Sequence, residues 1–315
     1  MKRTTILLHI GLFLLTFLTT TLAGVQWLNK DPLELSNFPF GLPYSLLLLL
    51  MLSAHEFGHF VAARLHGVDA TLPYYLPFPS FLFGIGLFGT FGAVIRVRSA
   101  IPSRKALFDI GASGPIAGFV VTLIILIIGL RTLPPIDYLY GIHPEYAKLA
   151  AIPQEGLTFG HTLLYDFLVK VCVPAGTFVP PMNEIYHYPF LCVGWFGMFV
   201  TAMNLLPIGQ LDGGHITFAM FGDLSHRIGQ ATLILLVVLG TLGFLPLVGI
   251  PFSYGWTGWL FWAIILVIFL RRSLLARPMP KDASCLSLSR FAIGWACGFV
   301  FIASFIPAAL SFVNP

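Results

Sequence analysis

Residues 50–67 read LMLSAHEFGHFVAARLHG and place histidines, a glutamate and an arginine in an otherwise apolar run. The run extends over residues 43–66, which is long enough for a membrane-spanning helix of about 20 residues. A charged side chain at the centre of a bilayer costs roughly 2.5–3.5 kcal/mol on insertion scales. An ionisable cluster at this depth is therefore expected to serve a function rather than to stabilise the helix.

The whole chain has the composition of a membrane protein. It has 315 residues, of which 57% are hydrophobic and 10% charged, whereas soluble domains are about 25% charged. The net charge of +4 gives no reason to expect a nucleic-acid partner. We predict an all-α polytopic protein with about seven transmembrane helices and the lipid bilayer as its surroundings. The candidate spans are 6–25, 43–66, 107–130, 188–222, 229–250, 255–271 and 290–311.

The first span is expected to remain in the protein. Its apolar run of about 20 residues exceeds the ~7–15 residues of a signal-peptide core, and a cleaved signal peptide is the competing interpretation. Most of the 17 lysines and arginines fall in loops on one side. The positive-inside rule then predicts a cytoplasmic N-terminus and an outside C-terminus. We expect a bacterial inner membrane, with a thylakoid or archaeal membrane as alternatives.

The segment after the second span reads as strand rather than span. It is rich in proline, phenylalanine and glycine and then alternates as AVIRVRS over residues 93–99. Ile95 and Val97 would lie on one face and the arginines between them on the other, which is strand periodicity. We predict a small β hairpin or re-entrant β segment on the inner side. An amphipathic loop at the lipid headgroups is the alternative.

The long outer loop, residues 131–187, offers no recognisable chemistry. Its stretch GHTLLYDFLVKV, residues 160–171, is predicted to form an interfacial helix. None of the four cysteines shows the CxxC spacing of a zinc finger or redox motif. A disulfide between Cys172 and Cys192 stays open, because spacing alone does not decide it.

The HEFGH sequence has the spacing of a metal site. His55 and His59 are four residues apart, so on a helix they lie one turn apart on one face and can bind one ion. Glu56 is rotated by about 100° and can reach a water on that ion without binding it. These are the two zinc ligands and the general base of a metalloprotease motif. A lone histidine in a span is more often a hydrogen-bonding group between helices, and we assign His9 to that class. Because His59 lies about 7 Å from Arg64 along the helix, the metal should lie within the bilayer, nearer the inner face.

A catalytic zinc needs a third protein ligand and an open position. The segment 188–222 is too long for one straight span, and Pro207, with Gly209, Gly213 and Gly214, should break it within the membrane. Asp212 lies in this predicted break and is the preferred third ligand.

Two other polar residues flank that aspartate. His215 is the rival third ligand. The amide of Asn204 would either stabilise the oxyanion formed when water attacks a peptide carbonyl or tie down the unwound turn. The sequence favours neither role for Asn204.

HEFGH followed about 150 residues later by NLLPIGQLDGGH resembles the site-2 protease family of intramembrane zinc metalloproteases. The resemblance implies that His55, His59 and Asp212 bind one zinc ion and that Glu56 is the base. DIGASGPIAGF is similar to the family's small-residue span, whose glycines allow close helix approach. The strand-like segment 84–99 and IPSRK are similar to the cyanobacterial and plastid branch. The outer loop is too short for the PDZ domain of about 80–90 residues that several members carry.

We therefore predict an intramembrane zinc metalloprotease that cleaves a transmembrane protein substrate within or next to its span. Residues 1–42 would hold the first span and an outer loop, 43–222 the catalytic core, and 223–315 three further spans. An edge strand at 93–98 is expected to hold the unwound substrate by strand addition. A metal transporter or sensor is the main alternative, although it has no need for the non-ligand acid Glu56. The second alternative is an inactive family member that binds other membrane proteins without cleaving them. The sequence does not indicate the oligomeric state.

Overall fold

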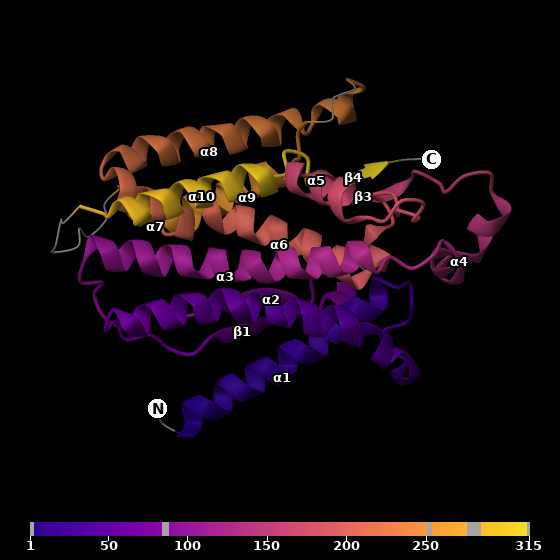
Figure 1. Cartoon of the computed structure of the whole chain (residues 1–315), viewed down its shortest axis with the longest axis horizontal. Helices are drawn as coiled ribbons and strands as arrows, with labels where there is room; N and C mark the ends of the chain where they lie inside the picture. Colours follow the sequence, from indigo (N-terminus) through magenta and orange to yellow (C-terminus); the bar gives the residue numbers. More distant parts are fainter. Residues whose placement is uncertain (1–2, 84–87, 251–253, 276–284, 314–315) are drawn as a thin grey trace.

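The computed structural model describes residues 3–83, 88–250, 254–275 and 285–313, and its main feature is a bundle of helices along the longest axis of the molecule (Figure 1). The two termini lie towards opposite ends of this axis. The long helices of the bundle are α1 (Arg3–Gln26), α2 (Phe38–Leu65), α3 (Arg104–Arg131), α6 (Pro189–Leu205), α8 (Leu224–Leu242), α9 (Gly258–Leu275) and α10 (Leu288–Ser304). The short helices are α4 (Asp137–Ile142), α5 (Leu163–Cys172) and α7 (Asp212–Phe221).

Several helices have the length and composition of membrane spans. Within the described residues, four are long and apolar enough to cross a bilayer, namely α1, α2 with its preceding turn, α3 and α8. The apolar helices α6, α9 and α10 have shorter described apolar stretches. Apolar side chains such as Leu14, Ile124 and Ile234 are exposed on the outside of the bundle, as expected where lipid is the solvent. These features support an integral membrane protein, and the count of about seven spans stays a prediction.

The predicted break in the fourth span lies between α6 and α7. Pro207 and Gly209 are in it, and Gly209 has a positive φ of 54°, a conformation that glycine adopts without strain. Gly213 and Gly214 were expected in the break but lie in the first turn of α7. A Cβ on Gly213 would come within 1.9 Å of the carbonyl oxygen of Leu205. Glycine is therefore needed here because the chain returns closely against the end of α6.

The predicted end of the last membrane span, at residue 311, was wrong. The last helix, α10, ends at Ser304 rather than at residue 311, and Pro307 favours extended backbone just before it. The chain then forms β4 (Leu310–Val313), which pairs antiparallel with β3 (Gly156–Phe159). This second small sheet was not predicted, because its two strands are about 150 residues apart in sequence. The helix α8 also ends earlier than predicted, at Leu242.

The predicted hairpin is present as β1 (Tyr74–Pro77) and β2 (Thr90–Val94), which pair antiparallel. The sheet packs against α1 and α2. His9 of α1 hydrogen-bonds the carbonyl of Pro73 just before β1, at 3.0 Å, so its partner is the β segment and not another helix as predicted. Residues 84–87, which open the predicted strand-like segment, lie outside the described residues.

The strand predicted at 93–98 is regular only as far as Val94. Beyond it, Ala70 and Val97 form an isolated antiparallel bridge. The backbone of Arg96 bonds to Thr71 on the same side, with the N–H of Thr71 donating to the carbonyl of Arg96 at 3.0 Å. The chain is thus extended through this segment, but its partner is the loop before β1.

The core lies around α6, whose side chains are almost all buried. Trp195 stacks on Phe199 and donates its indole N–H to the carbonyl of Gly160 at 2.7 Å. Cys172 and Cys192 are both buried and free, so the disulfide left open by the sequence is not formed. A helix is present within the stretch 160–171 as α5, one face of which is exposed; its placement at the membrane interface stays a prediction.

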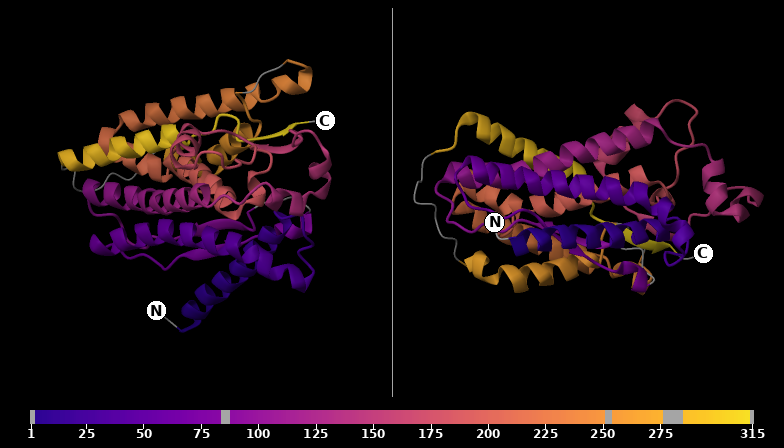
Figure 2. Two further views of the ribbon diagram at one scale, coloured as in Figure 1. Left: turned by 45° about the vertical axis from the view of Figure 1, so that its right-hand side comes forward. Right: turned by 90° about the horizontal axis from the view of Figure 1, so that it is seen from below.

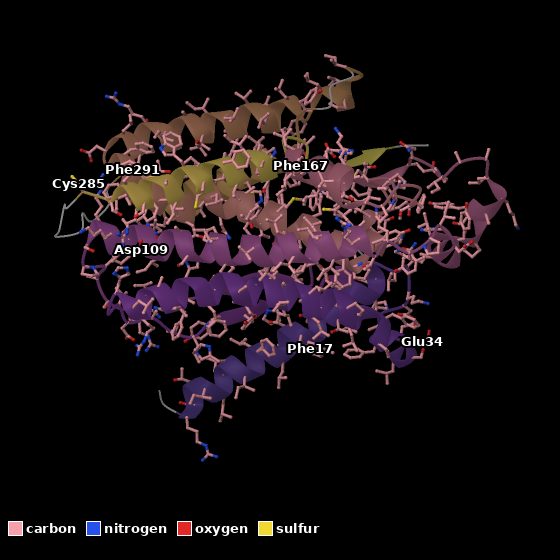
Figure 3. All side chains as sticks on the ribbon, in the orientation of Figure 1. Phe17, Glu34, Asp109, Phe167, Cys285 and Phe291 are labelled. Atoms are coloured by element: carbon pink, nitrogen blue, oxygen red, sulfur yellow. The ribbon has the colours of Figure 1, made fainter. Side chains whose placement is uncertain are left out.

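An ion pair ties α10 to the rest of the bundle. The carboxylate of Asp109 in α3 accepts two hydrogen bonds from Arg290 of α10, at 2.8 and 2.7 Å. It also accepts one from His66 at the end of α2, at 2.8 Å. Figure 3 shows Asp109 at the end of α3 that lies beside the start of α10, where Phe291 is labelled. Two long helices and the end of a third therefore meet at one charged contact.

Candidate metal centre

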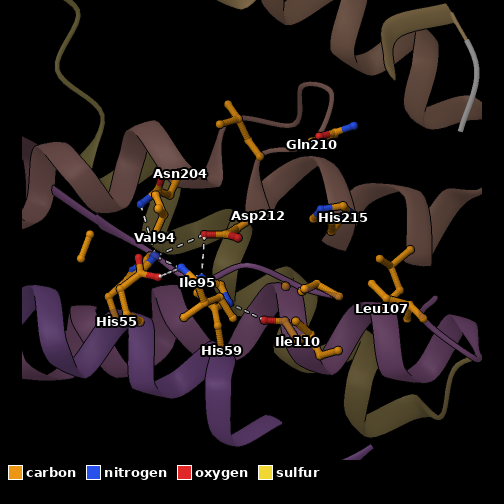
Figure 4. Close-up of a pocket in the computed structure, with 16 residues that line it drawn as sticks. His55, His59, Val94, Ile95, Leu107, Ile110, Asn204, Gln210, Asp212 and His215 are labelled. Carbon is orange, nitrogen blue, oxygen red and sulfur yellow. Dashed lines mark hydrogen bonds and ion pairs between the residues drawn. The ribbon is translucent and has the colours of Figure 1, made fainter. Parts of the chain in front are cut away.

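The candidate site lies between α2 and the start of α7 (Figure 4). The Nε2 atoms of His55 and His59 are 3.1 Å apart. The Oδ2 atom of Asp212 lies 3.4 Å from the first and 3.3 Å from the second. Tetrahedral zinc with bonds of about 2.0–2.2 Å keeps neighbouring ligand atoms about 3.3 Å apart. The three residues predicted as ligands are thus brought together at the spacing that one zinc ion requires.

Small residues of α3 make room for the two imidazoles. A Cβ on Gly114 would lie 2.1 Å from Nε2 of His59, and one on Gly118 would lie 3.1 Å from the Cβ of His55. The Nδ1 of His59 donates to the carbonyl of Ile110 at 2.6 Å. Because a carbonyl only accepts, Nδ1 carries the proton and Nε2 presents a lone pair to the site, as expected of a metal ligand.

Asp212 fits the ligand position better than its rival. It is the first residue of α7, where the helix dipole and unpaired N–H groups stabilise a negative charge. The sequence analysis placed Asp212 in the unwound break, whereas in the structure this residue begins a helix. His215 lines the same cavity one turn later but packs its Cβ near Gly111. Within the described residues, the cluster that could hold an ion at this place contains His55, His59 and Asp212 without His215.

Glu56 lies beside the metal-binding group without belonging to it. Its side chain is buried, at 7% exposure. Its Oε2 accepts a hydrogen bond from the backbone N–H of Ile95 at 2.8 Å. The sequence pointed to Ile95 as a substrate-facing strand residue, and it gave no sign that its N–H would orient Glu56. That contact depends on how the β segment folds back onto α2.

Asn204 also reaches the site. It lies near the C-terminal end of α6, and its Nδ2 is 3.4 Å from Nε2 of His55. The amide thus faces the same space as the three candidate ligands (Figure 4). The position suits a donor to substrate, and it also suits a group that fixes the end of α6.

Two cavities meet at these residues. One, of about 320 Å³, is lined by the candidate ligands, by Glu56 and Asn204, and by Ala93, Val94, Ile95 and Val97. The other, of about 340 Å³, shares His55, Glu56 and Asn204 and is otherwise lined mostly by apolar side chains of α2, β2, α6 and α9. The apolar cavity therefore adjoins the polar cavity that contains the candidate ligands.

The outer loop, whose sequence offers no recognisable chemistry, brings together a second group of possible ligands. His143, Glu184 and His187 form a second cluster with metal-ligand geometry among the described residues. Glu184 and His187 are three residues apart, which is a weak signal on its own. His143 joins them only through the fold, from 41 residues earlier in the chain.

The fold and the site define a class of protein: a helical membrane protein whose HExxH helix meets an aspartate from another helix in a group that could hold a metal ion. The chain belongs to Peptidase family M50, the site-2 protease family of zinc metalloproteases. The model of that family matches residues 43–245, which include all the candidate ligands.

Curated relatives support the same assignment. The chain is 27% identical over 274 residues to "Probable zinc metalloprotease EGY2, chloroplastic" of Arabidopsis thaliana, covering 85% of this chain and 43% of that protein. It is 32% identical over 204 residues to "Probable zinc metalloprotease EGY1, chloroplastic" of Oryza sativa subsp. japonica, covering 64% and 32%. The predicted similarity to the plastid-type branch is confirmed. The chain spans less than half the length of these relatives.

Proposed function

We propose that this protein is an intramembrane zinc metalloprotease that hydrolyses a peptide bond within or next to a transmembrane segment of a membrane protein. The observation that carries the proposal is the group of His55, His59 and Asp212, with both histidines buried and Glu56 beside them, among apolar helices. These three side chains would hold one zinc ion. When bound, the ion would supply the Lewis acidity that peptide hydrolysis needs.

The chain's own residues supply the remaining chemistry. Glu56 takes a proton from the attacking water and later passes it to the leaving amine. The hydrogen bond from the Ile95 N–H fixes one oxygen of Glu56, which leaves the other oxygen for this proton. The amide of Asn204 donates to the oxyanion that develops on the substrate carbonyl. The apolar cavity between α2, β2, α6 and α9 receives the substrate.

A substrate helix must unwind before cleavage, because a helix uses its carbonyls in its own hydrogen bonds. The segment after β2 offers a backbone edge for the unwound chain. Its Arg96 N–H and carbonyl bond to Thr71, so the alternation of a strand turns the backbone groups of Ile95 and Val97 the other way. The N–H of Ile95 is already bonded to Glu56, which leaves the Ile95 carbonyl and both backbone groups of Val97 for the substrate. Both residues line the cavity. We propose that the substrate adds to this edge as a strand.

The membrane placement belongs to the same proposal. The protein would be multi-pass in a bacterial inner membrane, with its N-terminus in the cytoplasm, and the hairpin and active site nearer the cytoplasmic face. Residues 43–222 would form the catalytic core between the first span and the three C-terminal spans. The non-ligating Glu56 in the site favours this function over metal transport.

The test is cleavage of a single-span protein by the purified full chain in lipid vesicles, with the cut mapped by mass spectrometry. Wild type is expected to cut within or next to the span, to lose activity on chelation, and to regain it with added zinc. His59→Ala, prepared identically, controls for contaminating proteases. A cut distant from the span, or equal cleavage by His59→Ala, would overturn the proposal.

A further inference from the structure

The second cluster lies near the other end of α6. His187 ends the helical turn that precedes α6, whereas Asn204 and the first site lie where α6 finishes. The helix between them is about 25 Å long. Figure 1 shows α4, which His143 follows, beyond the bundle end where α6 begins. The two clusters are therefore separate sites.

The three side chains of this cluster converge as metal ligands do. Nε2 of His143 and Nε2 of His187 are 3.0 Å apart. The Oε2 of Glu184 lies 3.8 Å from the first and 3.4 Å from the second. An ion at the centre of this triangle would lie about 2 Å from each atom, which is the length of Zn–N and Zn–O bonds. His187 is fully buried, and Glu184 is 2% exposed.

The proton positions leave three lone pairs facing one another. The Nδ1 of His187 donates to the carbonyl of Trp27 at 2.5 Å, and the Nδ1 of His143 donates to the carboxylate of Glu145 at 3.0 Å. In neutral imidazoles both Nε2 atoms are then acceptors. The Oε2 of Glu184 is buried and has no hydrogen-bond partner within the described residues. Three converging acceptors in a buried place repel one another unless a metal ion, or a proton on one of the imidazoles, lies between them.

One donor approaches the cluster from outside. The Nδ2 of Asn29 lies 3.2 Å from Nε2 of His143. Asn29 is exposed, and no bond joins its amide to Glu184 or His187 within the described residues. A single amide at the rim therefore does not satisfy the three acceptors.

Neighbouring groups orient each of the three side chains. The Oε1 of Glu184 accepts from the hydroxyl of Tyr146 at 3.1 Å and from the amide of Asn183 at 3.0 Å, which turns Oε2 towards the histidines. The ring of Tyr146 stacks on His143, with centroids 4.5 Å apart and 9° between the planes. Partners of this kind hold metal ligands in position in proteins.

We propose that His143, Glu184 and His187 bind a second zinc ion with a structural role. Two imidazoles and a carboxylate suit zinc. A fourth protein ligand closes most structural zinc sites, whereas here the fourth position would hold water. The ion would join the loop after α4 to the turn before α6, and through the Trp27 carbonyl to the chain after α1. It would therefore fasten the outer loop to the helix that leads to the first site. This proposal does not depend on proteolysis.

The test is the number of zinc ions per chain in purified full-length protein, saturated with zinc and washed. Wild type is expected to hold two ions. His55→Ala/His59→Ala, which leaves the second cluster intact, should keep one. Glu184→Gln should also keep one, and His161→Gln, in the same loop but paired with Asp166, should keep two.

Each arm can overturn the proposal. No ion in His55→Ala/His59→Ala, or two ions in Glu184→Gln, would do so. A single ion in wild type that is lost in His55→Ala/His59→Ala would also overturn it, whereas a single ion that this variant keeps would support the second site and contradict zinc at the first. If Glu184→Gln fails to fold, the His55→Ala/His59→Ala protein still decides, because its second cluster is unaltered. Its cobalt-loaded form should also show a visible absorption spectrum that is lost with the further change His143→Ala; a spectrum that survives this change would contradict the assignment.

Discussion

The two histidine clusters of this molecule are alike in geometry and differ in origin. The first takes both histidines from one helical turn of α2, with nitrogens 3.1 Å apart. The second takes them from the loop after α4 and the turn before α6, with nitrogens 3.0 Å apart. Beside the first lie the acid Glu56, which bonds to the backbone of Ile95, and a cavity that reaches the ligand group. Beside the second, the acid Glu145 accepts a hydrogen bond from the ligand His143. The same ligand geometry can thus serve a reaction at one end of α6 and hold loops together at the other.

The largest expected effect comes from removing the third ligand of the first site. Asp212→Ala should lower cleavage by roughly 10³-fold or more and remove one zinc ion, since catalytic zinc needs three protein ligands. His215→Ala is the matched control from the same helix and should keep most activity and the zinc. Cleavage and zinc content of both variants give the answer. Loss of zinc in His215→Ala with retention in Asp212→Ala would reverse the ligand assignment.

The close approach of α2 and α3 predicts the next effect. Gly114→Ala places a Cβ 2.1 Å from Nε2 of His59, so α3 or the imidazole must shift. Cleavage should fall by about 10²-fold, because small misplacements at a reacting centre have effects of that size. Gly298→Ala in α10, where a Cβ meets nothing within 4 Å, should be close to wild type. Equal activity in the two variants would show that the α2–α3 contact does not position the ligand.

The contact between Ile95 and Glu56 predicts a smaller effect without loss of metal. Ile95→Pro removes the N–H that donates to Glu56 and should lower cleavage by about 10–100-fold, because proline has no backbone donor. Val97→Pro should also impair cleavage if the substrate adds to this edge as a strand. Zinc content should stay at the wild-type value in both. Normal turnover in both variants would rule out strand addition.

The smallest effect sharpens the difference between the two clusters. Glu184→Gln should change cleavage by less than about threefold, because the second cluster lies the length of α6 from the reacting atoms. The melting temperature should fall instead, since an ion bound only to the folded state stabilises it. A loss of cleavage as large as that of Asp212→Ala would show that the two clusters do not have separate roles.

The first site could be predicted from the sequence because its signals are local or rare. HEFGH sets two histidines on one helical face, whatever the rest of the chain does. Asp212 stood out because acids are scarce in the apolar segments. Pro207 correctly predicted a break before Asp212, but the predicted break extended to Gly214, whereas α7 already begins at Asp212. These features depend on local backbone geometry and on the unfavourable free energy of a charged side chain in lipid.

The features that sequence reasoning missed depend on contacts between distant segments. The β3–β4 sheet joins strands about 150 residues apart, and the second cluster gathers side chains from two loop segments. The hydrogen bond from Ile95 to Glu56 uses a backbone group, which has no residue signature at all. Short polar segments such as these carry no periodicity from which their partners can be inferred.

The most direct test of the central claim is to measure bound zinc and cleavage on the same preparations of wild type and Glu56→Gln. If Glu56 is the base and not a ligand, Glu56→Gln should lose roughly 10²–10⁴-fold in cleavage and keep the zinc content of wild type. Wild-type cleavage by Glu56→Gln, or loss of zinc together with activity, would contradict the account.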